Sequence, residues 1–176
     1  NHREGTFVLG DIRDVLAADV PQHEFSWASF PCQDLSLAGR MEGIEAERSG
    51  LFWEWLRILR EMEDKPKVVC LENVVGLISA AEGLHYRSLH LSLAEQGYQV
   101  GAMILDALDW LPQSRRRVFV IGAREDIDIS QFSTDGPLWH HPKAVTRAAT
   151  GIDDFVFWNL PIPRERSVML EDLIDW

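Results

Sequence analysis

The sequence contains no apolar run that approaches the ~20 residues needed to cross a bilayer as a helix. Residues 1–5 are polar or glycine, and no hydrophobic signal-peptide core follows them. These absences argue against a membrane-spanning protein and against a secretory precursor. We therefore expect a soluble, cytoplasmic protein without a membrane partner.

Cysteine is scarce, because the chain contains 2, Cys32 and Cys70. Neither belongs to a Cys-x-x-Cys pair, so we expect no disulfide framework and no metal site. Cys32 therefore remains free for chemistry.

The patterns GxGxxG and GxxxxGK(S/T) are also missing, which argues against nucleotide binding by the usual glycine-rich turn.

Positive charge is in the minority, with 17 Lys and Arg against 28 Asp and Glu and a net charge of −11. Nucleic-acid binding depends on Lys and Arg that displace counterions, so the average surface does not favour it. A local cluster such as residues 115–117 could still engage a polyanion. The 176 residues, 46% of them hydrophobic, are enough for one globular domain.

Short apolar runs alternate with helical patterns along the chain. We expect strands at 5–12, 25–30, 67–71, 100–105 and 118–122. We expect amphipathic helices at 52–62 and 84–96, the second with Leu84, Leu89 and Leu93 inward and Gly97 as its stop. The alternation predicts an α/β fold with a mostly parallel sheet and helices on both faces.

Two segments lack a regular pattern. Residues 34–50 are rich in glycine and charge and read as a loop. Beyond residue 123 the pattern weakens, and we expect loop or linker there, with a short helix at 169–175. A sheet of this kind places ligands at the carboxyl ends of its strands, where Cys32 and Glu72 fall.

Cys32 follows Pro31 at the end of the second apolar run and precedes the glycine-rich loop. An accessible thiolate held in a fixed position is a nucleophile, whereas a free cysteine is more often a small buried hydrophobe. Cys70 fits the second description, because it lies inside an apolar strand. Local context leaves both descriptions open for Cys32.

Polar groups also mark the end of the strand at 67–71. Partial burial of Glu72 would let its carboxyl donate a proton or a hydrogen bond to a substrate ring nitrogen, although a strand-end acid can equally face water. Asn73 could orient Glu72 or contact substrate, or it could serve as ordinary turn chemistry.

Arg115 and Arg117 alternate on the approach to a strand, so we expect them on one side, with Arg116 on the other. Two fixed guanidinium groups suit an anion, a carbonyl oxygen or a phosphate, and a solvated basic patch is the alternative.

Taken together and in this order, the three motifs resemble the cytosine-carbon-5 DNA methyltransferase family. The matching segments are Pro31-Cys32-Gln33, Glu72-Asn73-Val74 and Gln113-Ser114-Arg115-Arg116-Arg117. Weaker matches are Gly10-Asp11-Ile12, which resembles a contact to the cofactor adenine, and the turn at 48–52, whose Leu51 would line the cofactor pocket. The resemblance covers roughly residues 1–125.

The resemblance implies an incomplete Rossmann-like fold that uses S-adenosylmethionine, and a bacterial restriction-modification enzyme that acts on double-stranded DNA. It implies that the Cys32 thiolate adds to carbon 6 of a flipped-out cytosine and that Glu72 hydrogen-bonds or protonates ring nitrogen 3. Arg115 and Arg117 would fix the base, and residues 34–49 would form a lid. The implied substrate-positioning residues are Pro31, Gln33, Ser36, Asn73, Val74 and Gln113. The implied cofactor-binding residues are Asp11, Ile12, Pro31 and Leu51.

The sequence departs from the family at its ends. The family's Phe-x-Gly-x-Gly loop, the acidic residue after it, the target-recognition domain and the final motifs are absent. We therefore expect a partial catalytic domain at 1–150 and, at 151–176, a linker towards a missing recognition domain. An incomplete sheet edge would favour self-association or leave residues 1–15 loosely held.

Two alternatives remain. A tRNA cytosine-5 methyltransferase of the same family commonly has a second proline before Pro-Cys, whereas this chain has Phe30, which favours DNA. A catalytically silent interaction module would have no need to keep Cys32, Glu72, Arg115 and Arg117 together.

The missing glycine-rich loop generates the first testable prediction. We expect the 176-residue chain to be inactive alone and to bind S-adenosylmethionine weakly or not at all. Titration calorimetry checks this, and a micromolar dissociation constant would contradict it.

Overall fold

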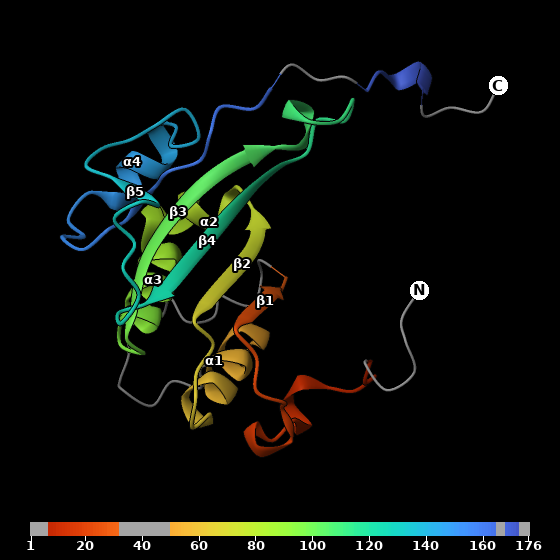
Figure 1. Cartoon of the computed structure of the whole chain (residues 1–176), viewed down its shortest axis with the longest axis vertical. Coiled ribbons are helices and arrows are strands. Elements are labelled where there is room, and N and C mark those ends of the chain that lie inside the picture. Colours follow the sequence, from red (N-terminus) through yellow and green to blue (C-terminus); the bar gives the residue numbers. More distant parts are fainter. Residues whose placement is uncertain (1–6, 32–49, 165–167, 173–176) are drawn as a thin grey trace.

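The computed structural model describes residues 7–31, 50–164 and 168–172. A four-stranded sheet lies at its centre, with the strand order β1-β2-β4-β3 (Figure 1). The strands are β1 (Phe25–Ser29), β2 (Val68–Val74), β3 (Tyr98–Asp106) and β4 (Arg116–Arg124). Strands expected at 25–30, 67–71, 100–105 and 118–122 are thus confirmed, with longer bounds for the last three.

The direction of one strand differs from expectation. β1 pairs with β2 in parallel, but β4 is antiparallel to both β2 and β3. Three strands therefore run the same way, and the expected parallel pairing is wrong around β4. The connection at 107–115 is too short for a helical crossover, so β4 turns back beside β3 and fills the space between β3 and β2.

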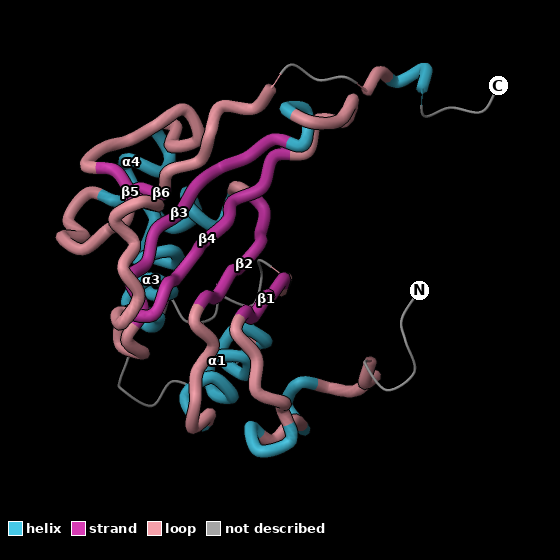
Figure 2. The backbone as a smooth tube through the Cα atoms, in the orientation of Figure 1, coloured by secondary structure: helices cyan, strands magenta, loops and turns pink. Residues whose placement is uncertain are grey.

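The helices lie behind the sheet in the view of Figures 1 and 2. They are α1 (Leu51–Glu61), α2 (Gly76–Ser79), α3 (Leu84–Ala94) and α4 (Lys143–Ala149). All four contribute to one core with Leu71 of β2 and Val120 of β4. In the described part of the chain, helices cover this face alone, so the expectation of helices on both faces is wrong there.

The two predicted helices follow their apolar periodicity. Six of the eleven residues of α1 are buried, and Arg57 forms ion pairs with Glu54 and Glu61 on its outer side. In α3, Leu89 and Leu93 are fully buried, and Gly97 adopts the left-handed φ of 83° after the helix ends. Leu84 is 58% exposed, so its inward placement is wrong for the first helical turn.

The strand expected at 5–12 is wrong. Residues 7–9 lie outside the sheet, and Ile12–Asp14 form a 3-10 helix. The Asp11 side chain accepts a hydrogen bond from the backbone N–H of Arg13 at 2.9 Å, which favours a turn over an extended strand. Among the residues that the structure describes, β1 is consequently an edge strand, and self-association through that edge stays a prediction.

The segment after residue 130 is more ordered than its sequence indicates. β5 (Ser133–Thr134) pairs with β6 (Phe157–Trp158), and α4 is short enough to escape a periodicity test. Within the short helix expected at 169–175, the described residues Leu170–Asp172 form a 3-10 helix. The Val156 N–H donates to Val100 O of β3 at 2.9 Å. Gly101 permits this approach, because an added Cβ would lie 1.8 Å from Val156 O. Residues 152–158 thus pack on the sheet, and the boundary at 150 stays a prediction.

Two adjacent histidines are buried under this segment. His140 is 1% exposed and its Nε2 lies 2.7 Å from the carbonyl oxygen of Trp158, and His141 is 4% exposed and its Nδ1 accepts from the Leu138 N–H. Burial lowers the pKa of both side chains, and His140 adds to the effect on His141, whose pKa falls to about 4.

This burial predicts acid sensitivity. Between pH 6.5 and pH 4 the unfolded chain takes up a proton at His141 that the folded chain does not. The free energy of unfolding therefore decreases as the pH is lowered, by about 3 kcal/mol for this residue. We expect His141→Asn, which keeps an acceptor for the Leu138 N–H, to flatten that part of the profile. Chemical denaturation at several pH values measures it. The half-buried His85→Asn is the control, and parallel profiles for wild type and His141→Asn would contradict the prediction.

Candidate functional site

The Glu72 carboxylate lies between two donors on neighbouring strands. Ser29, its register partner on β1, donates its hydroxyl to Glu72 Oε2 at 2.6 Å. From β4, Arg117 Nε forms an ion pair with Glu72 Oε1 at 2.8 Å. The side chains of Glu72 and Arg117 are 18% and 22% exposed, so water screens the pair only in part.

Strand alternation explains this placement. Leu71 and Asn73 of β2 face the helices, whereas Cys70 and Glu72 face the other side of the sheet. β2 continues through Val74, so Glu72 lies inside the strand. The sequence-based expectation that Glu72 lies at the end of the strand is therefore wrong. A carboxylate inside a strand needs partners, and Ser29 and Arg117 provide them.

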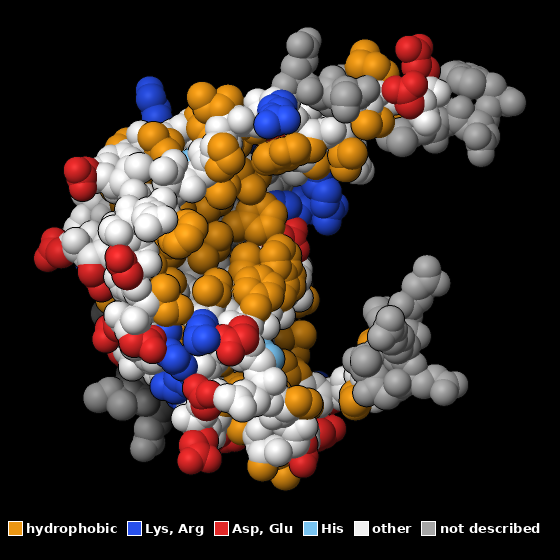
Figure 3. All heavy atoms as spheres, in the orientation of Figure 1, with side chains coloured by type: hydrophobic (Ala, Val, Ile, Leu, Met, Phe, Trp, Pro, Cys, Tyr) orange, Lys and Arg blue, Asp and Glu red, His pale blue; other side chains and the backbone are white. Residues whose placement is uncertain are grey.

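A cavity of about 320 Å³ opens beside this carboxylate. It is lined by Trp27, Glu72, Leu105, Ala107, Trp110, Arg115, Arg117 and Phe119. Arg115 and Arg117 therefore share one side, as predicted, and Arg116 does not line the cavity. Trp27 and Phe119 meet edge to face at 6.0 Å and provide an apolar wall. Figure 3 shows hydrophobic side chains gathered over the strands on this face, with basic side chains at both ends of that area.

Asp106 organises the turn that presents Arg115, and sequence reasoning missed it. Its Oδ1 accepts from the backbone N–H groups of Leu108 at 3.1 Å and Arg115 at 2.7 Å, and its Oδ2 accepts from Ser114 Oγ. These hydrogen bonds, first the one from Leu108, lower the pKa of Asp106. An aspartate directly after an apolar run is the signal that could have indicated such a turn.

Asn73 lies on the opposite face of β2 from Glu72. It is 5% exposed, and its Nδ2 donates to the carbonyl oxygen of Phe30 at 2.8 Å. Its Oδ1 accepts from the Val74 N–H at 2.8 Å. The side chain thus ties β2 to the backbone immediately before Pro31.

A second cavity, of about 550 Å³, lies between β1, α1 and the turn at 10–13. Asp11, Ile12 and Leu51, three of the four predicted cofactor residues, line it together with Phe30, the neighbour of Pro31. Arg13 donates to both carboxylate oxygens of Asp11, and this lowers the pKa of Asp11 to about 2. The cavity therefore combines apolar walls with an ionised acceptor.

The two cavities meet at β1. Trp27 lines both of them. Ser29 lines the larger cavity and holds Glu72 at the smaller one. Molecules in the two cavities would therefore lie on either side of the carboxyl end of β1.

Several predicted residues lie elsewhere. The described residues do not include Cys32, Gln33 or Ser36. Of the loop predicted at 34–50, they include Gly50 alone. Pro31 and Gln113 are exposed, and Val74 is 43% exposed beside Arg117 in the β2–β4 register. The roles assigned to these residues stay predictions.

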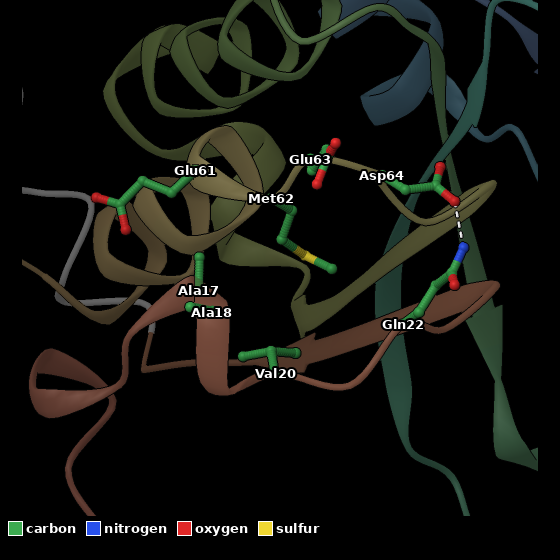
Figure 4. Close-up of a pocket in the computed structure, with 8 residues that line it drawn as sticks. All are labelled: Ala17, Ala18, Val20, Gln22, Glu61, Met62, Glu63 and Asp64. Atoms are coloured by element: carbon green, nitrogen blue, oxygen red, sulfur yellow. Dashed lines mark hydrogen bonds between the residues drawn. The ribbon is translucent and has the colours of Figure 1, made fainter.

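A third cavity, of about 520 Å³, lies at the amino ends of β1 and β2, away from Glu72 (Figure 4). Ala17, Val20 and Met62 give it apolar walls, and Gln22 donates a hydrogen bond to Asp64 at its rim. It contains none of the predicted site residues. Within residues 7–31, 50–164 and 168–172, no group of three or more His, Cys, Asp or Glu could hold a metal ion, and no helix is long and apolar enough to cross a membrane.

Comparisons with known proteins agree with the motif order. A family model described as C-5 cytosine-specific DNA methylase matches residues 1–160. The type II methyltransferase M.HhaI of Haemophilus parahaemolyticus is 38% identical over 129 residues, which are 73% of this chain and 39% of that protein. M.Bsp6I of Bacillus sp. (strain RFL6) is 29% identical over 171 residues, or 96% of this chain and 45% of that protein.

The chain spans less than half the length of these relatives. Among solved structures, the S. pombe Dnmt2 methyltransferase aligns with a TM-score of 0.47 and 21% identity, over 68% of this chain and 34% of that one.

The buried hydrogen bond of Asn73 generates a prediction. Asn73→Ala leaves the carbonyl of Phe30 without its partner, so we expect the free energy of unfolding to fall by about 1–3 kcal/mol. Urea denaturation measures the change. Asn159→Ala, at an exposed position, serves as the control, and equal stability of the two variants would argue against the anchoring contact.

Proposed function

The chain belongs to the C-5 cytosine-specific DNA methylase family, and from this premise we propose that it forms the base-binding and nucleophile-bearing part of a DNA (cytosine-5-)-methyltransferase. One observation carries the proposal. The Glu72 carboxylate is held by Arg117, next to Arg115, in a cavity that adjoins the cavity of Asp11, Ile12 and Leu51.

Cys32 is the proposed nucleophile. Asn73 anchors Phe30, and Pro31 restricts the backbone that leads from Phe30 to Cys32. The thiolate would form a bond to carbon 6 of cytosine, and the electron pair of the 5,6 double bond would then make carbon 5 nucleophilic. Cys70 is unsuited to this role, because burial raises the pKa of its thiol to about 12.

Glu72 and the two arginines are proposed to hold the base. The Glu72 carboxyl would hydrogen-bond or protonate ring nitrogen 3 and so accept part of the charge that develops on thiolate addition. Arg117 fixes the orientation of Glu72, and Arg115 presents a second guanidinium to the same cavity. Two fixed donors suit the carbonyl oxygen of the base or its phosphate.

The larger cavity is the proposed site of S-adenosylmethionine. Its volume of about 550 Å³ suits a small molecule. Ile12, Phe30 and Leu51 would enclose the adenine, and the ionised Asp11 could accept from its amino group. The bound cofactor would supply the methyl group for carbon 5. Loss of the carbon 5 proton would then release Cys32.

Double-stranded DNA is the proposed substrate, since two of the relatives are named as type II methyltransferases and Phe30 stands where the tRNA branch commonly has proline. A base in a duplex must leave the stack to reach such a cavity. A restriction-modification role in a bacterial cytoplasm follows from the same names and is part of the proposal.

Trapping with 5-fluorocytosine tests the mechanism. Fluorine cannot leave carbon 5 as a proton does, so an enzyme that attacks carbon 6 stalls as a covalent adduct with the oligonucleotide. The assay uses the longest expressed form of the protein that contains residues 1–176, with duplex DNA and tRNA as alternative substrates. We expect an adduct with DNA, its loss in Cys32→Ala and its retention in Cys70→Ala. An adduct that survives Cys32→Ala would show that the nucleophile is a different residue.

A further inference from the structure

We propose that Ser29 is a positioning residue for Glu72 and that it selects Oε2 as the carboxyl oxygen that carries the proton for the substrate ring. The inference rests on the proposed function and goes beyond it, because it assigns a role to a residue outside the three motifs and distinguishes the two oxygens of Glu72.

The contact is built into the sheet. Ser29 and Glu72 are register partners in the parallel pair of β1 and β2, and both side chains point to the face opposite the helices. The hydroxyl lies 2.6 Å from Oε2, within the range of a short hydrogen bond to a charged oxygen. The aromatic pair Trp27 and Phe119 borders the same cavity as Glu72.

The two partners of Glu72 differ in what they can do. The guanidinium of Arg117 can only donate, so Oε1 must remain an acceptor to keep the 2.8 Å ion pair. The hydroxyl of Ser29 can donate or accept, and it rotates to suit its partner. A proton on Oε2 therefore keeps both contacts, whereas a proton on Oε1 competes with the Arg117 N–H.

Ser29 thus supports both protonation states of the carboxyl group. When Oε2 carries a proton and no base is present, the hydroxyl of Ser29 can accept from it. When ring nitrogen 3 lies against Oε2, the proton points to that nitrogen and the Ser29 hydroxyl donates to Oε2. On transfer to ring nitrogen 3, the O–H bond at Oε2 breaks, an N–H bond forms, and the electron pair stays on the carboxylate. Ser29 and Arg117 then both donate to the anion, one to each oxygen.

The position of Ser29 ties this role to the methyl-transfer site. It lines the cavity proposed for the cofactor while it contacts Glu72 of the base cavity. Arg115 and Arg117 are the charged groups that line the base cavity with Glu72. A displaced Glu72 would leave ring nitrogen 3 without its partner at the moment when carbon 6 is attacked.

Three variants test the role in the longest expressed form of the protein that contains residues 1–176, with methyl transfer into duplex DNA measured over a range of DNA concentrations. Ser29→Ala removes the hydroxyl, and Ser29→Thr keeps it. Ser26→Ala removes a hydroxyl of the same strand that accepts from Trp55 Nε1 and does not touch Glu72. This variant is the control, because it measures how kcat changes when β1 loses a hydroxyl group that does not contact Glu72.

We expect Ser29→Ala to lower kcat about tenfold to a hundredfold, the range for one hydrogen bond to a charged group, with KM for DNA nearly unchanged. Ser29→Thr should recover most of kcat, and Ser26→Ala should keep kcat. Wild-type kcat in Ser29→Ala, or no recovery in Ser29→Thr, overturns the proposal.

A double-mutant cycle separates this inference from the proposed function. The shifts in melting temperature of Ser29→Ala, Glu72→Ala and the double variant are measured on the 176-residue chain, without substrate. We expect the double shift to be smaller than the sum of the single shifts. If wild type gives neither methyl transfer nor adduct, the proposed function fails. Coupled shifts would then still support Ser29 as the group that holds Glu72, and additive shifts would overturn it.

Discussion

The ion pair between Glu72 and Arg117 is the contact on which the rest of the candidate site depends. It joins a central strand to the reversed strand β4, and its two side chains are about one-fifth exposed. A carboxylate removed from water is costly unless a fixed donor faces it. The antiparallel insertion of β4 between β2 and β3 supplies that donor, and Asp106 then orders the turn that brings Arg115 to the same cavity.

Two neighbouring residues of β2 have different roles: Glu72 belongs to the candidate site, and Asn73 stabilises the fold. Glu72 points to the open face and meets Ser29 and Arg117, whereas Asn73 points into the helix-covered core and binds the backbone of Phe30. Strand alternation makes this division automatic, since consecutive side chains leave a strand on opposite faces. The dipeptide Glu72-Asn73 can therefore present an acid on one face of the sheet and, on the other face, anchor the backbone that leads to Cys32.

Periodicity predicted the elements whose signal is local. α1 and α3 show their apolar spacing, and β2, β3 and β4 each contain a continuous apolar run. The order and direction of strands depend on contacts between distant segments, so the sequence did not reveal that β4 inserts antiparallel. The strand expected at 5–12 is wrong because the Asp11 side chain accepts a hydrogen bond from the Arg13 N–H, which stabilises a turn. Ser29 escaped notice for a related reason: its partner Glu72 lies 43 residues away.

The carboxyl end of β1 sets the distance between the two proposed reactants. Trp27 borders both cavities, and Ser29 borders one while it binds the acid of the other. A methyl group passes directly between two molecules only if they touch, so the wall between their sites must be thin where they meet. A strand edge with one indole and one small hydroxyl side chain satisfies that requirement. A polar side chain much longer than that of serine or threonine would reach Glu72 as well, but it would occupy part of one of the two cavities that meet at this strand.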